Sequence, residues 1–325
     1  MSGCLYTECM KKIALIILLA LCLLLSGCGA ANAARSGMVF AMDTVMNLTT
    51  YGKGGKAALA DAERELYRLD GLLARGVEGS EVYVYNHEGR VEGGELQGLL
   101  DRAEKIGEAT AGAFDIYLGG VLDLWGFGSG AGEYRVPTEE ELSDAPPLLD
   151  LGGVAKGYAG ERMFKVMEDR GVQAAVLDLG GDVALWGAKP DGLWSIAIAD
   201  PTPGVDYLGV LEAEGGRFIM TSGVYERYFE ENGVRYHHVI DPRTRRPADS
   251  GLVSVTVICE SGVWADALAT ACCVMGAERS LELRESLADT MAFDLILVDV
   301  DGRVRYTYAG FTPEPGNEYI YEQVS

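Results

Sequence analysis

The sequence predicts an α+β fold: one large domain with mixed or antiparallel sheets and packed helices. Amphipathic helical patterns dominate the first half of the chain, whereas short apolar or alternating runs separated by turn residues dominate from residue 173 onward. Helices and strands are interleaved without the βαβ rhythm that a doubly wound parallel sheet requires. These two observations favour α+β over α/β.

The expected elements of the first half follow from their patterns. A strand is expected over 38–52, and apolar residues at i, i+3 and i+4 spacing predict helices over 56–74 and 95–109. Thr138 and Glu141 form a possible capping box for a short helix. A further helix is expected over 153–169, ended by Gly171.

The second half is expected to consist mainly of strands. Asn232-Gly233 suits the two-residue loop of a hairpin, and an Asp-Gly pair at 301–302 suits a second hairpin near the end of the chain. A helix is expected over 263–275. The expected strands are 174–181, 182–187, 194–201, 207–213, 217–223, 234–240, 252–259, 295–300 and 303–310.

The N-terminal segment reads as a targeting signal. Lys11–Lys12 precedes an apolar run over 13–25, and Leu-Ser-Gly-Cys follows, ending at Cys28. This ending resembles a bacterial lipobox. We therefore expect a signal peptide over 1–27, lipidation of Cys28, a tether over 28–37, and a protein anchored to the membrane on its extracytoplasmic face in the cell envelope. The alternative is an uncleaved anchor, although the run is short for a spanning helix.

Composition limits the partners. The chain of 325 residues has a formal net charge of −22. Such a charge argues against nucleic acid and against an anionic membrane surface as partners. An acidic protein that holds a phosphate group needs backbone amides or a cation at that place. Outside the signal and Cys28, the cysteines are Cys259, Cys272 and Cys273; they lack metal-ligand spacing and are expected to be buried thiols.

A glycine-rich segment at 149–159, LDLGGVAKGYA, is the first candidate for chemistry. Gly152 and Gly153 lie at an expected helix start, where exposed N–H groups and the helix dipole favour an anion, and Lys156 adds a positive charge. The glycine spacing differs from that of a Walker loop or a dinucleotide fingerprint. An ordinary strand-to-helix turn explains the segment equally well.

Asp266 and Thr270 lie four residues apart on an expected helix and therefore project from one face. A carboxylate and a hydroxyl together suit a hard cation such as Mg²⁺. Taken alone, Asp266 is more simply explained as a partner of the helix dipole.

Two of the three histidines are adjacent in the segment YHHVIDPRTRRP. Side chains of neighbouring residues in a strand point to opposite faces, so at most one of His237 and His238 can face a given site. The other histidine then belongs to the opposite face. An imidazole with a pKa near neutrality is suited to acid–base chemistry.

Several motifs occur together in one order along the chain. They are AMDTVM at 41–46, GAFD at 112–115, LWGFG at 124–128, LDLGGVAKGYA at 149–159, LDLGGD at 177–182, TSGVYERYF at 221–229, HHVIDP at 237–242 and ADALAT at 265–270. This series resembles the ApbE family, the FAD:protein FMN transferases of bacterial envelopes. The similarity covers roughly residues 38–300 and implies an ApbE-like catalytic domain over 38–325.

The resemblance implies an activity. Members of the family cleave the pyrophosphate of FAD, release AMP, and attach FMN to a threonine or serine hydroxyl of an acceptor flavoprotein subunit, with Mg²⁺ as cofactor. By position, the resemblance implies that His238 and Asp266 are catalytic and that Ala155 (through its carbonyl), Asp266 and Thr270 hold the metal. It also implies FAD contacts for Met42, Ala113, Phe114, Asp115, Gly152, Tyr158 and Ile240, and Lys156 would stabilise charge on the phosphates.

Three positions depart from the family pattern. Gly76 stands where many members have an aromatic residue that stacks on the flavin. Arg245 replaces a glycine in the turn after Asp241-Pro242, which could alter the turn or add a phosphate contact. Ala269 stands where some members have a further acidic metal ligand.

Two other functions remain open from the sequence. A related enzyme would use water in place of the acceptor hydroxyl and hydrolyse FAD to FMN and AMP. A flavin-binding lipoprotein without catalysis would also fit an acidic anchored domain, although simple binding needs no metal motif.

Overall fold

The computed structural model describes residues 33–91, 93–128, 132–189 and 191–324. The expected signal peptide and Cys28 lie outside these residues. Within the described ranges, helices and sheets of mixed type confirm the α+β class. None of the helices in these ranges is long and apolar enough to cross a membrane.

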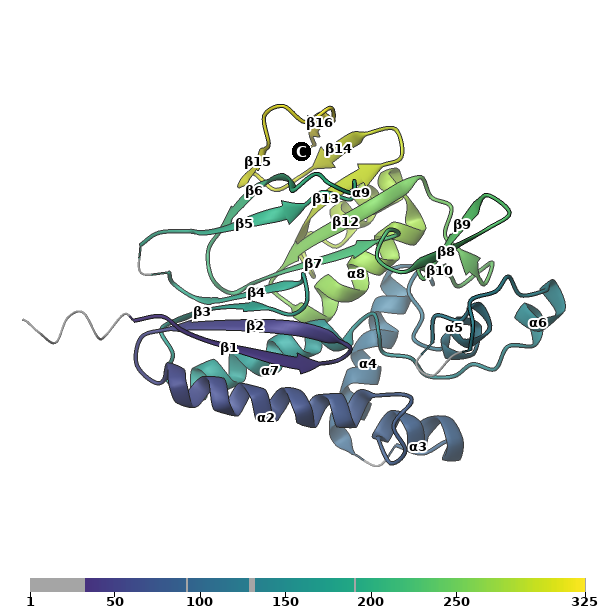
Figure 1. Cartoon of the computed structure of the whole chain (residues 1–325), viewed down its shortest axis with the longest axis horizontal. Helices are drawn as coiled ribbons and strands as arrows, with labels where there is room; N and C mark the ends of the chain where they lie inside the picture. The colour runs from purple at the N-terminus through teal and green to yellow at the C-terminus, as the bar shows by residue number, and fades with distance from the viewer. Residues whose placement is uncertain (1–32, 92, 129–131, 190, 325) are drawn as a thin grey trace, which may run out of the picture.

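A nine-stranded sheet forms the centre of the molecule (Figure 1). Its strands pair antiparallel except for the last pair, β14 and β16, which are parallel. In spatial order the strands are β1 (Arg35–Ala41), β2 (Thr44–Tyr51), β3 (Ala174–Asp178), β4 (Val183–Gly187), β7 (Arg217–Gly223), β12 (Leu252–Cys259), β13 (Phe293–Asp299), β14 (Arg303–Tyr306) and β16 (Ile320–Gln323).

Three smaller sheets accompany the large one. The order β15–β6–β5 makes a three-stranded antiparallel sheet that packs on one face of the large sheet through a second apolar core. Two hairpin-like pairs, β8–β9 and β10–β11, lie beside the helices α5 (Gly119–Trp125) and α6 (Glu139–Asp144) (Figure 1). The bounds are β5 (Trp194–Ala199), β6 (Tyr207–Ala213), β8 (Tyr228–Glu231), β9 (Val234–His237), β10 (Ile240–Asp241), β11 (Arg246–Pro247) and β15 (Phe311–Pro313).

The main helices cover the other face of the large sheet. α2 packs on β1, β2 and α7, while α8 packs on β7 and β12 and is buried around nearly its whole circumference. Together they enclose the largest apolar core. The helices are α2 (Gly55–Leu73), α3 (Glu81–Glu88), α4 (Gly94–Ala109), α5 (Gly119–Trp125), α6 (Glu139–Asp144), α7 (Ala155–Asp169), α8 (Gly262–Met275) and α9 (Ala277–Ser286).

The expected strand over 38–52 is wrong as a single element. The segment folds as a hairpin, in which β1 and β2 pair around Met42 and Asp43. Both turn residues have positive φ, 52° and 58°, which is the left-handed geometry of a two-residue hairpin loop. The boundary between tether and domain also moves, because β1 begins at Arg35 and not after residue 37.

Other local expectations are confirmed or corrected. The Thr138–Glu141 capping box is present, and Asn232 and Gly233 form the left-handed turn between β8 and β9. The strand expected over 234–240 is interrupted at His238, where β9 has ended and β10 has not begun. The helices α3, α5 and α9 and the strands β11, β15 and β16 were not expected.

Candidate active site

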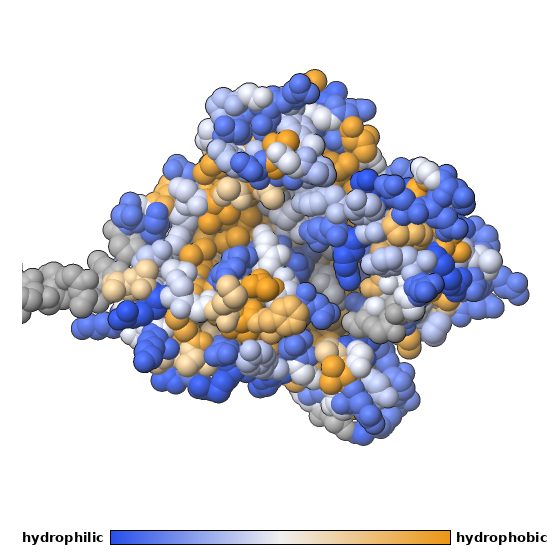
Figure 2. All heavy atoms as spheres, in the orientation of Figure 1, coloured by the Kyte–Doolittle hydropathy of each residue, from blue (hydrophilic) through white to orange (hydrophobic). Residues whose placement is uncertain are grey.

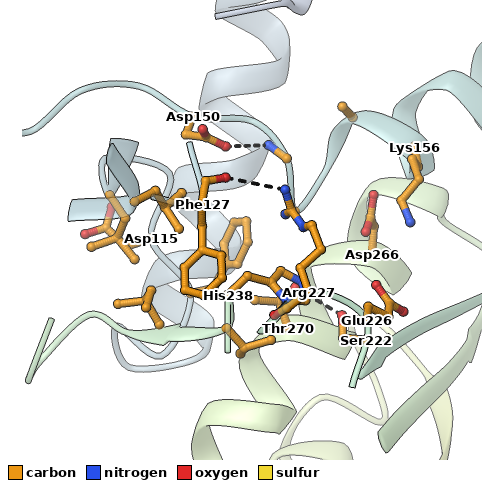
Figure 3. A pocket seen from close by; sticks show the side chains of 18 of the residues that line it. Asp115, Phe127, Asp150, Lys156, Ser222, Glu226, Arg227, His238, Asp266 and Thr270 are labelled. Carbon is orange, nitrogen blue, oxygen red and sulfur yellow. Dashed lines mark hydrogen bonds between the residues drawn. The ribbon is translucent and has the colours of Figure 1, made fainter. Parts of the chain in front are cut away.

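A cavity with a volume of about 380 Å³ lies where segments from most of the chain meet (Figure 3). The β1–β2 turn, the head of α7, the end of β7 and the middle of α8 all contribute walls. Of the residues expected at the site, the lining includes Met42, Ala113, Phe114, Asp115, Gly152, Ala155, Lys156, His238, Ile240, Asp266 and Thr270. The structure therefore brings together residues that are far apart in the sequence.

Close contact between α7 and α8 builds one corner of this cavity. A Cβ atom on Gly157 would lie 2.1 Å from the carbonyl oxygen of Gly262, so only glycine allows the helices to approach this closely. The approach brings Asp266 of α8 against the first turn of α7, where the Gly157 N–H donates a hydrogen bond of 2.8 Å to Asp266 Oδ2. The carboxylate thus satisfies a backbone donor that a helix start leaves unpaired.

Asp266 and Thr270 point into the cavity from successive turns of α8, as expected from their spacing. Asp266 is only 5% exposed, and burial raises the pKa of its carboxyl to about 7, against the opposing effect of Lys156. The Thr270 hydroxyl lies 3.2 Å from the Ser222 hydroxyl. A buried carboxylate with a spare oxygen, next to a hydroxyl, is suited to a hard cation.

Lys156 lies beside Asp266, and its ammonium group forms an ion pair with Asp182. Asp182 is 2% exposed and accepts a second hydrogen bond of 2.7 Å from the Thr221 N–H. Although burial disfavours the charged amine, the carboxylates of Asp182, Asp266 and Glu226 raise the pKa of Lys156. The corner therefore groups three acidic side chains around one ammonium, and the guanidinium of Arg227 also lies in the cavity lining.

This charge balance fits a site for a divalent cation. A ligand with phosphate groups would add negative charge to a corner that already has an excess of it. Within the described ranges, no group of three His, Cys, Asp or Glu side chains is arranged to hold a metal ion. Asp266, Thr270 and the carbonyl of Ala155 are the lining residues whose oxygens would hold a cation here.

The two histidines face opposite sides, as expected. His237 is buried, its Nε2 lies 3.0 Å from the Ala248 carbonyl oxygen, and it lines a second cavity. His238 lines the first cavity, with Nδ1 3.3 Å from the Arg227 carbonyl oxygen. This contact assigns the proton to Nδ1 and leaves Nε2 as an acceptor.

The surroundings of His238 keep its ring neutral. Burial, followed by the charge of Arg227, lowers the pKa of His238 to about 3. A neutral imidazole can accept a proton, but a pKa this low makes His238 a weak base. The negative charge of a bound phosphate would raise its pKa and strengthen it as a base.

An apolar wall faces the charged corner. Phe114 packs against the turn before α7, where a Cβ on Gly153 would lie 3.0 Å from the Phe114 ring. Phe127, Leu118 and Leu122 continue this wall. A wall of this kind is suited to a flat heterocycle. In contrast, Trp125 is fully buried in the core, and its indole N–H donates to the Arg245 carbonyl.

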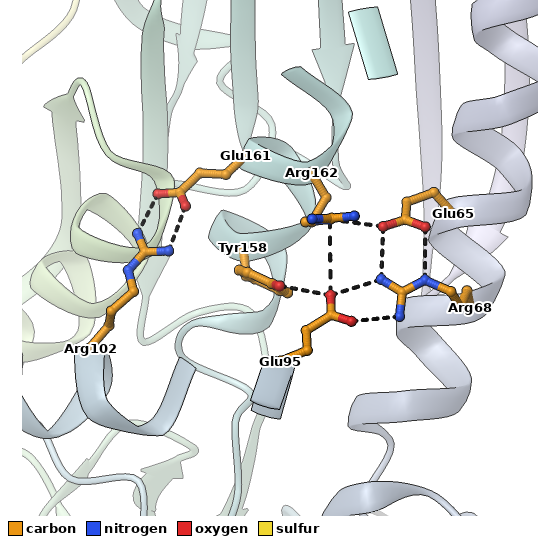
Figure 4. Close-up of polar contacts among 7 residues, drawn as sticks. All are labelled: Glu65, Arg68, Glu95, Arg102, Tyr158, Glu161 and Arg162. Carbon is orange, nitrogen blue, oxygen red and sulfur yellow. Dashed lines mark hydrogen bonds and ion pairs between the residues drawn. The ribbon is translucent and has the colours of Figure 1, made fainter. Parts of the chain in front are cut away.

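Tyr158 is the expected site residue that the structure does not bring into the cavity. Its hydroxyl donates a hydrogen bond of 2.7 Å to Glu95 (Figure 4). Glu95 also pairs with Arg68, so Tyr158 belongs to a polar network that joins α2, α4 and α7. The lining of the cavity therefore gives no support to a contact between the Tyr158 side chain and FAD.

The three departures from the family pattern lie away from the cavity lining. Arg245 has a left-handed backbone conformation, with φ 58°, and its guanidinium donates to the carbonyls of Leu142 and Ser143 in α6. Arg245 thus braces the turn and makes no contact with the cavity. Ala269 is fully buried in the core.

Sequence reasoning missed several lining residues. Glu226 and Arg227 line the cavity, and burial raises the pKa of Glu226. Asp182 is not a lining residue and acts on the cavity through its ion pair with Lys156. Asp182 and Glu226 lie within motifs that carry the family resemblance, LDLGGD and TSGVYERYF. Their inclusion in those motifs was the signal that could have identified them.

Known proteins of similar sequence point to one family. The model of the ApbE family matches residues 42–293. A relative from Vibrio cholerae named FAD:protein FMN transferase is 32% identical, over 92% of this chain and 98% of its own length. A relative of the same name from Escherichia coli K12 is 35% identical, over 58% of this chain and 62% of its own length.

Solved structures show the same fold. The ApbE protein from Thermotoga maritima superposes with a TM-score of 0.75 at 30% identity, over 84% of this chain and 96% of that one. The flavin transferase ApbE from Vibrio cholerae superposes with a TM-score of 0.72 at 28% identity, over 87% and 97%. From the family match, the relatives and the shared fold, we conclude that this chain belongs to the ApbE family.

Proposed function

We propose that the protein is a transferase that moves FMN from FAD to a threonine or serine hydroxyl of an acceptor protein and releases AMP, with Mg²⁺ as cofactor. Relatives with the name FAD:protein FMN transferase support the flavin transfer. The observation that carries the rest is the pairing of an apolar wall with a charged corner in one cavity. The wall suits the flavin ring, and the corner suits a pyrophosphate together with a cation.

The reaction is a displacement at the phosphorus on the FMN side. The acceptor oxygen forms a bond to this phosphorus, the bond to the bridging pyrophosphate oxygen breaks, and AMP leaves with that oxygen. Mg²⁺, when bound, neutralises charge on the phosphate oxygens. Such reactions depend mainly on positioning and on charge stabilisation.

Residues of the chain account for the remaining requirements. Lys156, fixed by Asp182, presents a positive charge to the phosphates. His238 presents a free Nε2 that can take the proton of the acceptor hydroxyl, and Glu226 is a second candidate base in the same cavity. Phe114 and Phe127 exclude water from the flavin side.

We also propose that the mature protein is held at the extracytoplasmic face of the membrane by lipid on Cys28. The lipobox at the end of the apolar run supports this location. The acceptor would then be a flavoprotein subunit of the same compartment.

An assay with FAD, Mg²⁺ and an acceptor domain that carries a candidate threonine tests the function. We expect AMP release and, by mass spectrometry, FMN on the acceptor, with both products lost in Asp266→Ala. The exposed Asp191→Asn is the matched control and should retain activity, because its carboxylate is 77% exposed and outside the cavity lining. AMP and free FMN without modified acceptor would indicate the hydrolase, and bound FAD without AMP release would indicate a binding protein.

A further inference from the structure

We propose that the outer face of the β1–β2 hairpin is a membrane-docking surface that rests against the lipid bilayer. We call Met38, Phe40 and Val45 the hairpin face. This inference rests on the lipid anchor proposed at Cys28 and adds to it a defined contact between the folded domain and the membrane.

The hairpin face consists of large apolar side chains in open solvent. Met38, Phe40 and Val45 are 71%, 63% and 45% exposed. Phe40 and Val45 are directly paired across the two strands, and Met38 lies two residues from Phe40 on the same face. The alternate residues of β1, Val39 and Ala41, are buried against the helical side of the sheet.

The rest of the molecule leaves this face open. The three-stranded sheet packs on residues of β3, β4, β7, β12, β13 and β14, and β1 contributes nothing to that core. β1 is also the edge of the large sheet. Figure 2 shows apolar side chains gathered over β1 and β2 in the middle of this view. A cluster of this kind on a protein surface commonly marks a contact site.

The acidic side chain that lies beside the hairpin face on β3 is hydrogen-bonded within the protein. Asp178 is the neighbouring acid on β3, and its carboxylate accepts hydrogen bonds of 3.0 Å from the Asn47 amide and 2.9 Å from the Gly181 N–H. The three side chains of the hairpin face carry no charge themselves, although the whole chain is strongly acidic and the exposed Asp43 lies in the adjoining turn. It is suited to the headgroup–acyl boundary of a neutral bilayer, where apolar side chains can insert without electrostatic attraction.

The position of the anchor supports a bilayer as the occupant. Six residues, 29–34, lie between Cys28 and the first residue of β1, Arg35, so seven Cα–Cα steps join the two. Fully extended, they span at most about 25 Å. A lipid on Cys28 would therefore keep the start of the hairpin within about 25 Å of the membrane surface. This confinement raises the effective concentration of membrane at the hairpin face.

Docking through the hairpin face would also fix the position of the cavity relative to the membrane. The two strands of the hairpin are joined by Met42 and Asp43, and both line the cavity. The β1–β2 hairpin therefore carries both the hairpin face and part of the cavity wall. The cavity would be held at a fixed height and orientation, which suits an acceptor hydroxyl on a membrane-bound protein.

Site-specific labelling of the lipidated full-length protein tests this inference. In the described ranges the native cysteines are the buried Cys259, Cys272 and Cys273, so an introduced surface cysteine can be labelled selectively. Phe40→Cys and Ile320→Cys form a matched pair: both positions are 63% exposed, and they lie on opposite edge strands, β1 and β16. Each variant receives an environment-sensitive fluorophore and is reconstituted in phosphatidylcholine vesicles that contain spin-labelled acyl chains.

We expect quenching of the label at position 40 to exceed that at position 320 by at least threefold, and to be insensitive to salt. Met38→Cys, labelled in the same way, should behave like Phe40→Cys and guards against a local defect in one variant. Equal quenching at the two edges would overturn the inference. A signal at position 40 that depends on protein concentration and not on vesicles would overturn it in favour of a second copy of the chain.

Two further measurements separate this inference from the proposals on which it rests. Flotation with vesicles, compared with Cys28→Ser, tests the anchor alone, and failure to float would contradict the anchor and the docking surface together. AMP release in solution tests the flavin chemistry alone. Neither Phe40 nor Ile320 lines the cavity, so both labelled variants should retain this activity.

Discussion

At the residue scale, two glycines, Gly157 of α7 and Gly262 of α8, allow the close helix contact that positions Asp266 in the charged corner of the cavity. A Cβ atom on Gly157 would lie 2.1 Å from the carbonyl oxygen of Gly262, and a Cβ atom on Gly262 would lie 2.2 Å from the carbonyl oxygen of Gly157. We expect Gly157→Ala to push α7 from α8, to lower the free energy of unfolding by about 1–3 kcal/mol, and to abolish AMP release because Asp266 moves. Chemical denaturation and the AMP assay measure the two effects.

Gly98→Ala is the matched control for this substitution. Gly98 also lies inside a helix, α4, but a Cβ there meets nothing within 4 Å. This variant should be neutral or more stable by about 0.5–1 kcal/mol and fully active. If Gly157→Ala behaved in the same way, the close contact between α7 and α8 would not be what positions Asp266.

The Lys156–Asp182 pair permits a sharper experiment on charge. Lys156→Met leaves the buried Asp182 carboxylate without its cation, so we expect a clear fall in melting temperature together with loss of activity. The double variant Lys156→Met/Asp182→Asn removes the unpaired charge and should recover much of the stability while remaining inactive. A double variant that regained AMP release would show that the phosphates do not need the ammonium group of Lys156.

Some residues of the site could be predicted from local sequence patterns, whereas others depend on how distant segments pack together. The i, i+4 spacing of Asp266 and Thr270 fixes one face of a helix, so their joint orientation follows from helix geometry alone. The role of Asp182 does not follow from any local pattern, because it depends on where β4 and α7 meet. The Tyr158 side chain points away from the cavity because Glu95 and its arginine partners hold the hydroxyl on the far side of α7.

At the scale of elements, a polar network joins α2, α4 and α7. Glu65 accepts hydrogen bonds from Arg68 and Arg162, and these contacts lower its pKa to about 2 against the opposing effect of burial. Arg68 also pairs with Glu95. The network therefore fixes α7, which carries Lys156, against the two helices that precede it (Figure 4).

Because of this network, we expect the stability of the fold to depend on pH in the acid range. The pKa of Glu65 is lower in the folded protein than its ordinary value of 4.5, so its contribution is fully present above about pH 4.5 and is lost as the pH falls toward 2. Glu65→Gln should reduce stability at pH 7 by about 0.5–1 kcal/mol and flatten its decline between pH 4.5 and 2. Thermal melts across this range measure the effect. Glu168→Gln, in an exposed pair with Lys165, should leave the profile unchanged.

The sequence predicted long elements better than short ones. The helix over 56–74 is correct to within a residue because Ala62, Leu66 and Leu69 repeat on one buried face. The β1–β2 hairpin was missed because its turn is Met42-Asp43, which lacks the glycine or asparagine that usually occupies left-handed positions. The helix α3 was missed because its eight residues have almost no apolar face.

At the scale of the whole molecule, binding of a cation should stabilise the fold. A ligand that binds only the folded state at about 100 times its dissociation constant adds about 2.7 kcal/mol. We expect Mg²⁺ to raise the melting temperature by several degrees in the wild-type protein and in Asp191→Asn, and to have no such effect in Asp266→Ala. An equal rise in all three proteins would contradict a site at Asp266.

The cavity draws its walls from nearly the whole length of the chain, from Met42 in the first hairpin to Thr270 in α8. A ribosome synthesises the β1–β2 hairpin long before it synthesises α8. A partly synthesised chain therefore has only the hairpin side of the cavity and cannot enclose a ligand. Export in an unfolded state would have the same effect, because the pieces of the cavity cross the membrane separately. Under the export proposed above, the protein would gain its activity only after the whole chain had crossed the membrane, and acceptors still in the cytoplasm would escape modification.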